Sequence, residues 1–321
     1  MKRVVSVSLG SSKRDKTSEV EMLSQQFEIS RIGTDGDMKR FAELVRALDG
    51  NVDAIGLGGI DRYLWTDTRR YTVRDADKLA RNAKITPVVD GSGVKNTLER
   101  RTIEFIHESG ILDFTDKKVL LVCAADRFGM AQTVEKLAGE VIFGDLMFSL
   151  GIPIPMRSYA TVRTLGALFL PLIVRLPFKW LYPTGDKQEK NEPKHQKYYQ
   201  WADVIAGDYH IIKRTMPPVE SGLLQGKVVI TNTITPEDTQ MLMDQKIDML
   251  ITATPEYDGR YYAANVFEGL LITLLEKKPE DVTVDDYEQL LRDMDWHPTI
   301  TRLRSSPPTA TAIRSQLIAD S

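Results

Sequence analysis

The sequence predicts an α/β protein of two α/β domains, the second of them a Rossmann-like doubly wound parallel sheet. Short apolar strands alternate with helical patterns along most of the chain, which is typical of parallel sheets. The chain has 321 residues, more than one hydrophobic core usually supports. Several predicted strands run directly into turns rich in Gly, Ser and Asp, where open α/β sheets bind their ligands.

The composition narrows the class of protein. Hydrophobic residues make up 42% of the chain and charged residues 27%, as in ordinary soluble domains. A formal net charge of -3 offers no basic excess to a phosphate backbone, which argues against a nucleic-acid partner. The single cysteine, Cys123, is interpreted as a small core residue in a reducing compartment. The N-terminal apolar stretch is too short for a signal peptide, so we expect a cytoplasmic protein.

The first predicted domain covers residues 1–112. Its helix at Met38–Leu48 carries apolar side chains at spacings of three and four. The predicted strands are Val4–Ser8, Phe27–Ile32, Val52–Leu57 and Thr86–Val89, and the other helices are Val73–Asn82 and Val94–Glu108.

The turns after these strands are the expected substrate-binding edge of an interdomain cleft. The residues concerned are Ser11, Ser12, Gly58, Gly59 and Ser92. The alternative is that such residues only end strands and begin helices.

The second predicted domain covers residues 113–276. The run Lys118–Cys123 is almost wholly apolar, which favours a central parallel strand that is buried on both faces. The C-terminal segment 277–321, with a helix at Val284–Asp293, is expected to pack back on the first domain. The further strands are Val141–Phe143, Val204–Ala206, Val228–Thr231 and Met249–Thr252, and the further helices are Ala131–Ala138, Pro236–Gln245 and Tyr261–Leu275.

The loop after the first strand of this domain, Ala124–Gly129, aligns with the dinucleotide fingerprint G-x-G-x-x-G. Only its last glycine, Gly129, is present. Asp126 places a carboxylate where phosphate would lie. Either the guanidinium of Arg127 supplies the phosphate contact, or the loop holds something other than a dinucleotide. With Ala124 and Phe128, these are the predicted cofactor-binding residues of the loop.

The second half of the fingerprint is an acidic residue at the end of the next strand. Asp145 follows Ala124 by 21 residues and is predicted to bind ribose hydroxyls. The expected cofactor is NAD or NADP, and Asp145 favours NAD because a carboxylate repels a 2′-phosphate. Asn232, Thr233 and Thr254, at the ends of later strands, are expected to face the nicotinamide half or else to cap the following helices.

The arrangement of a glycine-turn N-terminal domain, a Rossmann middle and a returning C-terminal helix resembles the quinate/shikimate dehydrogenase architecture. The segments Val52–Asp61 and Asp203–His210 are similar to those of bacterial proteins automatically labelled quinate 5-dehydrogenase. Characterised shikimate dehydrogenases carry an N-terminal serine motif and a lysine in an N-V-T-x-P-x-K segment, and neither is present here. Ser8, Ser11 and Ser12 are candidates to replace the first motif, and Lys95 is a candidate to replace the second.

Hydride transfer from an alcohol requires a base for the hydroxyl proton. The candidate is Lys95, oriented by Asp61 or Asp90, with an ordinary solvated lysine as the alternative. His210 is the histidine best placed to contact a substrate. No pair of histidines or cysteines has metal-ligand spacing, so no metal is expected.

An apolar insertion at 152–199 is not part of an ordinary Rossmann crossover. It contains Leu165–Val174, which is too short to span a bilayer. Three interpretations remain open: a homo-oligomer interface through residues 160–182, a lid over an apolar substrate, or a peripheral membrane contact.

The sequence leads to two functional hypotheses. The first is an NAD(P)-dependent oxidoreductase that acts on a small hydroxylated substrate at the interdomain cleft. The second is a non-redox nucleotide- or metabolite-binding protein that has repurposed the Rossmann fold.

Overall fold

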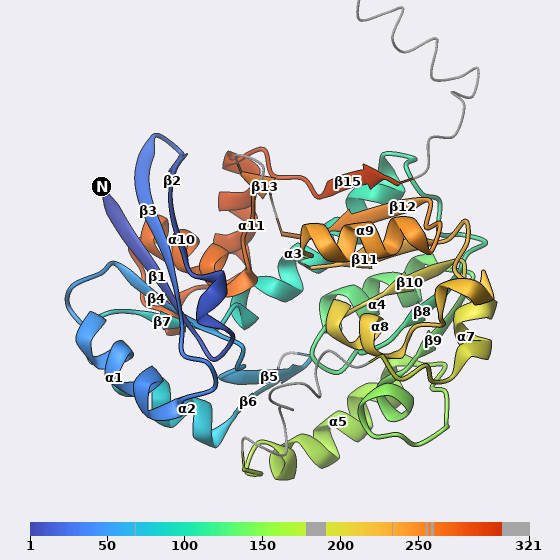
Figure 1. Ribbon diagram of the computed structural model, residues 1–321, viewed down its shortest axis with the longest axis horizontal. Helices are drawn as coiled ribbons and strands as arrows, with labels where there is room; N and C mark the ends of the chain where they lie inside the picture. The colour runs from blue at the N-terminus through green and yellow to red at the C-terminus, as the bar shows by residue number, and fades with distance from the viewer. Residues whose placement is uncertain (68, 178–190, 233, 255, 258–259, 304–321) are drawn as a thin grey trace, which may run out of the picture.

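The computed structural model describes residues 1–67, 69–177, 191–232, 234–254, 256–257 and 260–303. These residues form two larger sheets, and helices cover each of them (Figure 1). The prediction of a mixed α/β fold with two sheet-bearing domains and parallel strands is therefore confirmed.

The first sheet has five strands in the order β2-β3-β1-β4-β7, and only β2 runs antiparallel to its neighbour. Side chains of β1 alternate between two cores, with Val4 in one and Val7 in the other, because successive strand residues point to opposite faces. A separate hairpin, β5–β6, follows β4. The strands are β1 (Lys2–Ser8), β2 (Lys16–Met22), β3 (Gln25–Gly33), β4 (Ala54–Gly58), β5 (Tyr63–Thr66), β6 (Arg69–Thr72) and β7 (Val88–Val89).

Helices cover both faces of the first sheet. One core contains residues of α1 (Met38–Leu48) and α2 (Arg74–Ala80). The other contains residues of α10 (Ala264–Leu275), α11 (Val284–Asp293) and the start of α3 (Ser92–Glu108). The first domain is therefore completed by helices from the far end of the chain.

The second sheet has the order β15-β12-β11-β10-β8-β9, parallel except for β15. The chain passes from β8 to β9 at one edge and then crosses back to β10 on the other side of β8. This reversal is the topological switch point at which doubly wound sheets bind ligands. The strands are β8 (Lys118–Leu121), β9 (Glu140–Phe143), β10 (Val204–Ala206), β11 (Val228–Thr231), β12 (Met249–Thr252) and β15 (Thr299–Arg302).

Helices also cover both faces of this sheet. One core takes in α4 (Phe128–Leu137) and the start of α5 (Tyr159–Ile173). The opposite core takes in residues of α7, α8 and α9. The remaining elements are α7 (Gln196–Trp201), α8 (Tyr209–Thr215), α9 (Pro236–Asp244), η1 (Ser12–Arg14), η2 (Asp145–Ser149), η4 (Val219–Ser221), η5 (Pro279–Asp281), β13 (Glu256–Tyr257) and β14 (Arg260–Tyr261).

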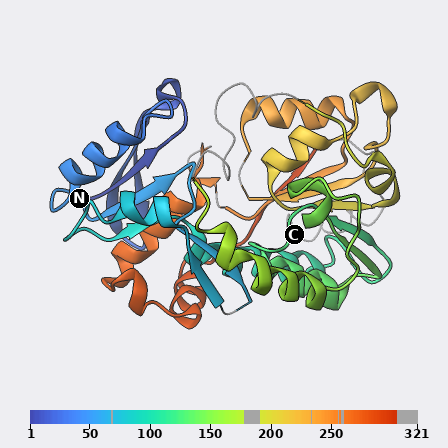
Figure 2. The same ribbon diagram turned by 90° about the horizontal axis from the view of Figure 1, so that it is seen from below.

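Two helices belong to the cores of both domains. In α3, Val94 and Leu98 pack in the first domain, whereas Ile103 and Ile106 pack in the second. In α5, Tyr159 and Val162 pack in the second domain, whereas Leu170 and Val174 pack in the first. Seen from below, α5 passes across the region where the two domains meet (Figure 2).

The outer face of α5 is apolar near its C-terminal end. Leu168 and Leu172 are each 63% exposed, and Phe169 is also exposed. No helix in the described part of the chain combines the length and apolar character that crossing a bilayer requires. Residues 178–190 of the predicted insertion lie outside the described residues.

The C-terminal part of the chain is distributed between the domains. The prediction placed the helix now seen as α10 within residues 113–276 of the Rossmann domain, but α10 packs on the first sheet. It is buried on most sides because it lies between that sheet and α11. In the 277–321 segment, α11 packs on the first domain and β15 pairs with β12 of the second sheet. Residues 304–321 lie outside the described part.

Candidate functional site

The candidate site lies where the first half of α3 meets the loop between β8 and α4. Gly129 makes this close approach possible, because a Cβ atom at this position would overlap the backbone oxygen of Asn96. The Gly129 N–H donates to the Asn96 side-chain oxygen over 3.1 Å. The one fingerprint glycine that the sequence retains is therefore required for contact between helices of two domains.

A cluster of five charged residues lies in this contact, and we call Lys95, Glu99, Asp126, Arg127 and Asp208 the interdomain cluster. Lys95 is ion-paired with Asp126, and Arg127 is ion-paired with Glu99. Arg127 also reaches Asp208 at 3.1 Å. The side chains of Arg127 and Glu99 are only 4% and 1% exposed, whereas that of Asp208 is 30% exposed. The cluster thus extends from the buried contact toward solvent.

Arg127 takes its position from the topology of the second sheet. It is the N-cap residue of α4, in the loop after β8, and Asp208 follows the neighbouring strand β10 and caps α8. Their ion pair therefore spans the switch point between β8 and β10. Because its guanidinium already pairs with two carboxylates, Arg127 is not presented to an incoming phosphate in this arrangement.

The charges of the cluster shift one another's pKa values. Burial disfavours the charged form of Lys95, but the charges of Asp126, Asp61 and Glu99 together outweigh this and raise the pKa of Lys95 above its ordinary value. Burial raises the pKa of Glu99 to about 6, against the opposing effects of Arg127 and Lys95. Burial acts to raise the pKa of Asp208, yet Arg127 and smaller effects of His210, the Ile211 N–H and Lys95 together hold it below its ordinary value. Lys95 is therefore an ammonium group at neutral pH.

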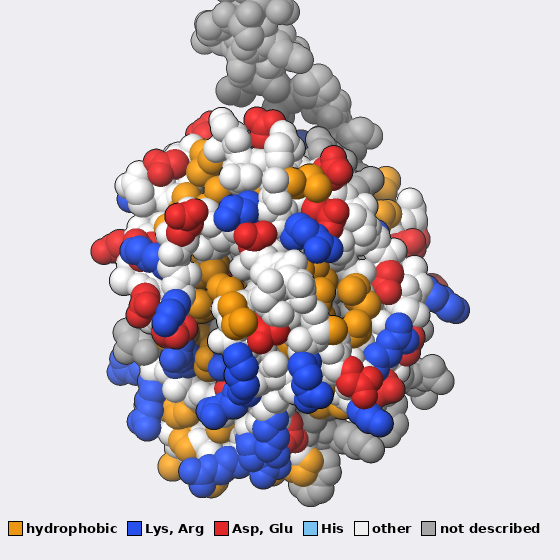
Figure 3. Space-filling view, turned by 90° about the vertical axis from the view of Figure 1, so that its left-hand side faces the viewer, with side chains coloured by type: hydrophobic (Ala, Val, Ile, Leu, Met, Phe, Trp, Pro, Cys, Tyr) orange, Lys and Arg blue, Asp and Glu red, His pale blue; other side chains and the backbone are white. Residues whose placement is uncertain are grey.

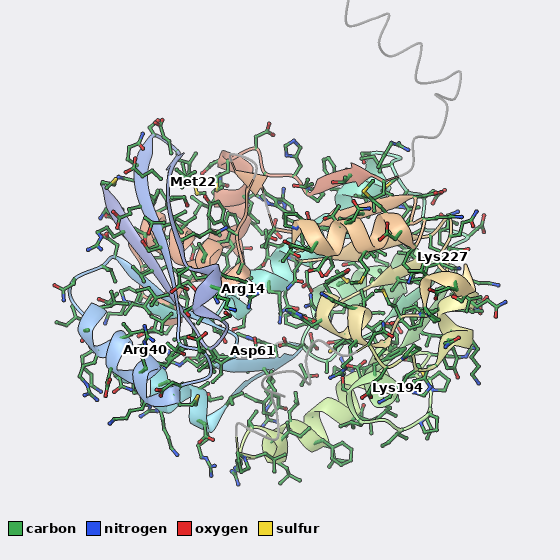
Figure 4. All side chains as sticks on the ribbon, viewed as in Figure 1. Arg14, Met22, Arg40, Asp61, Lys194 and Lys227 are labelled. Atoms are coloured by element: carbon green, nitrogen blue, oxygen red, sulfur yellow. The ribbon has the colours of Figure 1, made fainter. Side chains whose placement is uncertain are left out.

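Asp90 and Asp61 adjoin this cluster on the first domain. The Asp90 carboxylate accepts the backbone N–H groups of Arg62 and Tyr63, at 2.6 and 2.9 Å, and the hydroxyl of Ser92 at 2.6 Å. Burial and the charge of Asp61 raise the pKa of Asp90. In Figure 4, Asp61 lies on the side of the first domain that faces the second. Asp61 also contributes to raising the pKa of Lys95, so the structure brings all three predicted catalytic residues into one region.

Asp145 holds the loop after β8. Its Oδ1 accepts the backbone N–H groups of Ala124 and Ala125, at 2.9 and 2.7 Å, and burial raises its pKa against the effect of these two bonds. Its Oδ2 is buried and has no hydrogen-bond partner among the described residues. Asp145 therefore lies beside the loop, as predicted, but one of its oxygens binds backbone amides of the loop itself.

Three buried polar atoms in the contact also have no hydrogen-bond partner within the described part of the chain. Two are carboxylate oxygens, Glu99 Oε2 and Asp126 Oδ1, and the third is the amide nitrogen Asn96 Nδ2. Buried polar groups are nearly always hydrogen-bonded, and each such carboxylate oxygen is costly to leave unpaired. The contact thus offers two acceptors and one donor to a group that the described part of the chain does not supply.

The turn at the start of α3 is held by a residue that the sequence analysis did not single out. Glu268, on α10, accepts the Gly91 N–H at 2.6 Å and the hydroxyl of Tyr287 at 2.9 Å. Burial and the charge of Asp90 raise the pKa of Glu268 to about 8. Gly91 has a φ of +92°, which favours glycine.

The other predicted substrate-binding residues of the first domain mainly stabilise turns. Ser11 caps η1 through its hydroxyl, and the Ser12 N–H donates to Asp35. Gly58 lies too close to Ser8 to carry a Cβ atom without a shift, and Gly59 has a φ of +71°. These roles explain the glycine-rich turns without a ligand.

The predicted residues at the later strand ends lie in the second domain. The backbone N–H of His210, near the start of α8, donates to Asp208. The Thr254 hydroxyl donates to the backbone oxygen of Asn232 at 2.5 Å, which joins the ends of β11 and β12. Phe128 lies beside Trp65 of the first domain, with ring centroids 6.4 Å apart. Thr233 lies outside the described residues.

Sequence reasoning missed Glu99 and Asn96 as site residues. Glu99 is four residues after Lys95 on α3, so the spacing places both on one helix face. That spacing was an available signal, but an i,i+4 pair on a helix is more often a solvated pair. Only the approach of α4 makes these two positions part of a site.

The fold and site together define a two-domain α/β protein with a charged, partly unsatisfied contact at its Rossmann switch point. Residues 93–303 match the family model described as "Domain of unknown function (DUF8754)", and residues 3–90 match "Domain of unknown function (DUF8753)". The chain belongs to the DUF8754 family. No curated protein sequence matches it.

Solved structures with similar folds share little sequence with this chain. A hetero-hexameric glutamate dehydrogenase from Thermus thermophilus has a TM-score of 0.45 and 12% identity, with 92% of this chain and 74% of that chain covered. A glucose-galactose binding protein from Geobacillus stearothermophilus has a TM-score of 0.37 and 10% identity, with 96% and 99% covered.

Proposed function

We propose that the protein binds a small polyhydroxylated molecule at the interdomain cluster. The observation that carries this proposal is the pair of buried carboxylate oxygens, Glu99 Oε2 and Asp126 Oδ1, that have no donor among the described residues. Ligand hydroxyl groups donate to such oxygens, and a ligand oxygen accepts from Asn96 Nδ2. Because these atoms are buried at the domain contact, the domains must separate for the ligand to enter.

The charge of the region supports a neutral or cationic ligand. Two cations face more carboxylates than they can neutralise, so the formal charge of the region is negative. An anion is repelled there, whereas hydroxyl groups and ammonium groups are attracted. The cations are Lys95 and Arg127, and the carboxylates are Asp90, Glu99, Asp126 and Asp208.

The protonation state of Lys95 defines what it contributes. Its raised pKa keeps the ammonium form, so Lys95 donates a hydrogen bond to a ligand oxygen and does not act as a base while it is paired with Asp126. Any chemistry at this site therefore uses Lys95 as a proton donor to an oxygen atom.

Small molecules retained by the gently purified protein test this proposal, with identification by mass spectrometry. We expect a hydroxylated compound, and we expect Asp126→Asn to lose it because the carboxylate acceptor becomes an amide. Asp116→Asn is the matched control, since Asp116 is exposed and away from the contact. A retained compound without hydroxyl groups, or equal retention by both variants, contradicts the proposal.

The second candidate is NAD(P)-dependent oxidation or reduction of a hydroxylated substrate at the same place. It is favoured by Asp145, which follows β9 and has a buried Oδ2 without a partner in the described chain, because a dinucleotide ribose binds a carboxylate at this position of the fold. The pyrophosphate half does not fit the loop as it stands. The amides of Ala124 and Ala125 are bonded to Asp145, and Asp126 adds a negative charge.

Fluorescence titration with NADH and with NADPH separates the two candidates. Because the loop does not fit a pyrophosphate, we expect no saturable binding of either nucleotide. Saturable binding that is lost in Asp145→Asn, with Asp116→Asn unaffected, replaces the first candidate with the second.

A further inference from the structure

A pocket of about 600 Å³ lies outside the interdomain cluster, where β6, α2 and the end of α5 meet. Its lining includes the apolar residues Tyr71, Pro171 and Val174. Its charged lining consists of one carboxylate, Asp77, and five arginines, namely Arg69, Arg70, Arg74, Arg81 and Arg175. In the space-filling view, Lys and Arg side chains gather over the lower half of the face that carries α1 and α2 (Figure 3).

The positive charge of this pocket is only partly neutralised. Asp77 pairs with Arg81 at 2.6 Å and also with Arg62 at 2.9 Å, which lies outside the pocket lining. Arg74 lies 3.3 Å from Asp75. Within the described residues, no carboxylate forms an ion pair with the remaining three arginines. Five arginines beside two acids, Asp75 and Asp77, leave an excess of positive charge in a chain of net charge -3, which creates a local positive potential.

Contacts with aromatic rings hold two of these arginines in place. The Arg70 guanidinium lies 4.4 Å from the ring centroid of Tyr63, and that of Arg69 lies 5.1 Å from the ring centroid of Tyr71. Stacking restricts the planar guanidinium groups before a ligand arrives. Less conformational entropy is therefore lost when they bind an anion.

The pocket is built from the first domain and from the end of α5, a helix that starts in the core of the second domain. Arg69, Arg70 and α2 belong to the first domain, whereas α5 starts in the core of the second. The Arg74 backbone N–H donates to the Val174 oxygen at 3.0 Å, which fixes the end of α5 to the start of α2. A ligand that contacts Arg175 together with Arg70 therefore ties α5 to the first domain.

We propose that this pocket binds a ligand that carries two or more phosphate groups, and that the bound ligand fastens α5 to the first domain. Guanidinium groups match phosphate oxygens with paired hydrogen bonds, and three arginines without an ion pair to a described carboxylate call for more than one phosphate. A pocket of about this volume accommodates a small molecule. The phosphates belong either to a soluble polyphosphate compound or to a phosphorylated lipid headgroup.

Calorimetric titration with inorganic triphosphate tests the soluble source. We expect saturable binding that weakens as NaCl is raised and that is at least about tenfold weaker in Arg70→Gln/Arg175→Gln, which removes two charge-assisted contacts. The matched control is Arg157→Gln/Arg292→Gln, because both arginines are more than half exposed and the change in net charge is the same. The control is expected to bind as the wild type does.

Sedimentation with phosphatidylcholine vesicles, with and without phosphatidylinositol 4,5-bisphosphate, tests the lipid source. Binding only to the phosphorylated vesicles, lost in the pocket variant and kept in the control, supports the proposal with a lipid ligand. If the double variant unfolds at a lower temperature than the wild type, Arg69→Gln is used with the same criterion. Absence of binding in both assays, or equal weakening by pocket and control variants, overturns the proposal.

Discussion

Arg127 pairs with Glu99 across the domain contact and with Asp208 within the second domain. The sequence placed Arg127 correctly in the loop after the first Rossmann strand, but the loop alone gives no information about which acid it meets. Glu99 is on a helix of the neighbouring domain and is distant in the chain. This pairing depends on the fit of α4 against α3, which a local pattern does not encode.

The substitution Arg127→Met is expected to lower the free energy of unfolding by about 3–5 kcal/mol, because it leaves a buried carboxylate uncompensated. Urea unfolding measures this loss. Arg157→Met, an exposed position, is expected to change the free energy of unfolding by less than about 1 kcal/mol. The double variant Arg127→Met/Glu99→Leu is expected to lose less than Arg127→Met alone. A larger loss in the double variant speaks against a buried ion pair.

Glu268 makes stability depend on pH. Its pKa is raised from 4.5 to about 8 in the folded protein, so the folded state binds the proton more tightly than the unfolded state does. Its contribution to stability is therefore complete below the unfolded pKa and is lost as pH rises toward 8. The size of this contribution is on the order of 5 kcal/mol.

Urea unfolding of the wild type and of Glu268→Gln, measured between pH 5 and about pH 8, tests the role of this carboxyl. The free energy of unfolding of the wild type is expected to fall relative to that of the variant as pH rises, because glutamine does not ionise. Glu280→Gln is the control, as Glu280 is exposed. If the difference in free energy of unfolding between wild type and variant stays constant across this range, the prediction is contradicted.

Among helices and strands, apolar runs in the sequence predicted the bounds most reliably. The strands Val204–Ala206, Val228–Thr231 and Met249–Thr252 and the helix Val284–Asp293 have the predicted bounds. The strands that were missed are those with few buried residues. In β2, alternate residues are exposed and several are charged, and β15 is a half-buried edge strand. Their pairing depends on a neighbouring strand more than on their own composition.

The contact between α3 and α4 depends on Gly129. The substitution Gly129→Ala forces its new methyl group into the Asn96 backbone, so we expect a loss of about 1–3 kcal/mol in the free energy of unfolding. Gly166→Ala in α5 is the control, since its Cβ atom meets a side-chain oxygen of Thr66 at 3.0 Å and alanine favours a helix. Thermal unfolding measures both variants, and equal melting temperatures contradict the tight contact.

The whole molecule presents an apolar helix face to solvent. Leu168, Phe169 and Leu172 lie exposed along α5, within the segment that the sequence predicted as a homo-oligomer interface. We expect the protein to form a symmetric dimer through this face, since a two-fold axis buries the same residues from both copies.

Light scattering after size-exclusion chromatography tests the dimer. Leu168→Ser/Leu172→Ser is expected to convert it to a monomer, whereas Ile85→Ser/Val284→Ser, at other exposed positions, is expected to leave the mass unchanged. A wild-type monomer contradicts the expectation.

The first domain is begun early in synthesis but is completed late, because it includes helices from later parts of the chain. The strands of the first sheet end at Val89, but one of its cores includes α5 residues up to Val174 and the other includes α10 and α11. While α10 and α11 are still unmade, the core that contains Val4 and Ala54 lacks most of its helical residues. The N-terminal sheet therefore remains incomplete until most of the chain has been synthesised, and a nascent chain halted before Ala264 is a substrate for chaperones rather than a folded domain.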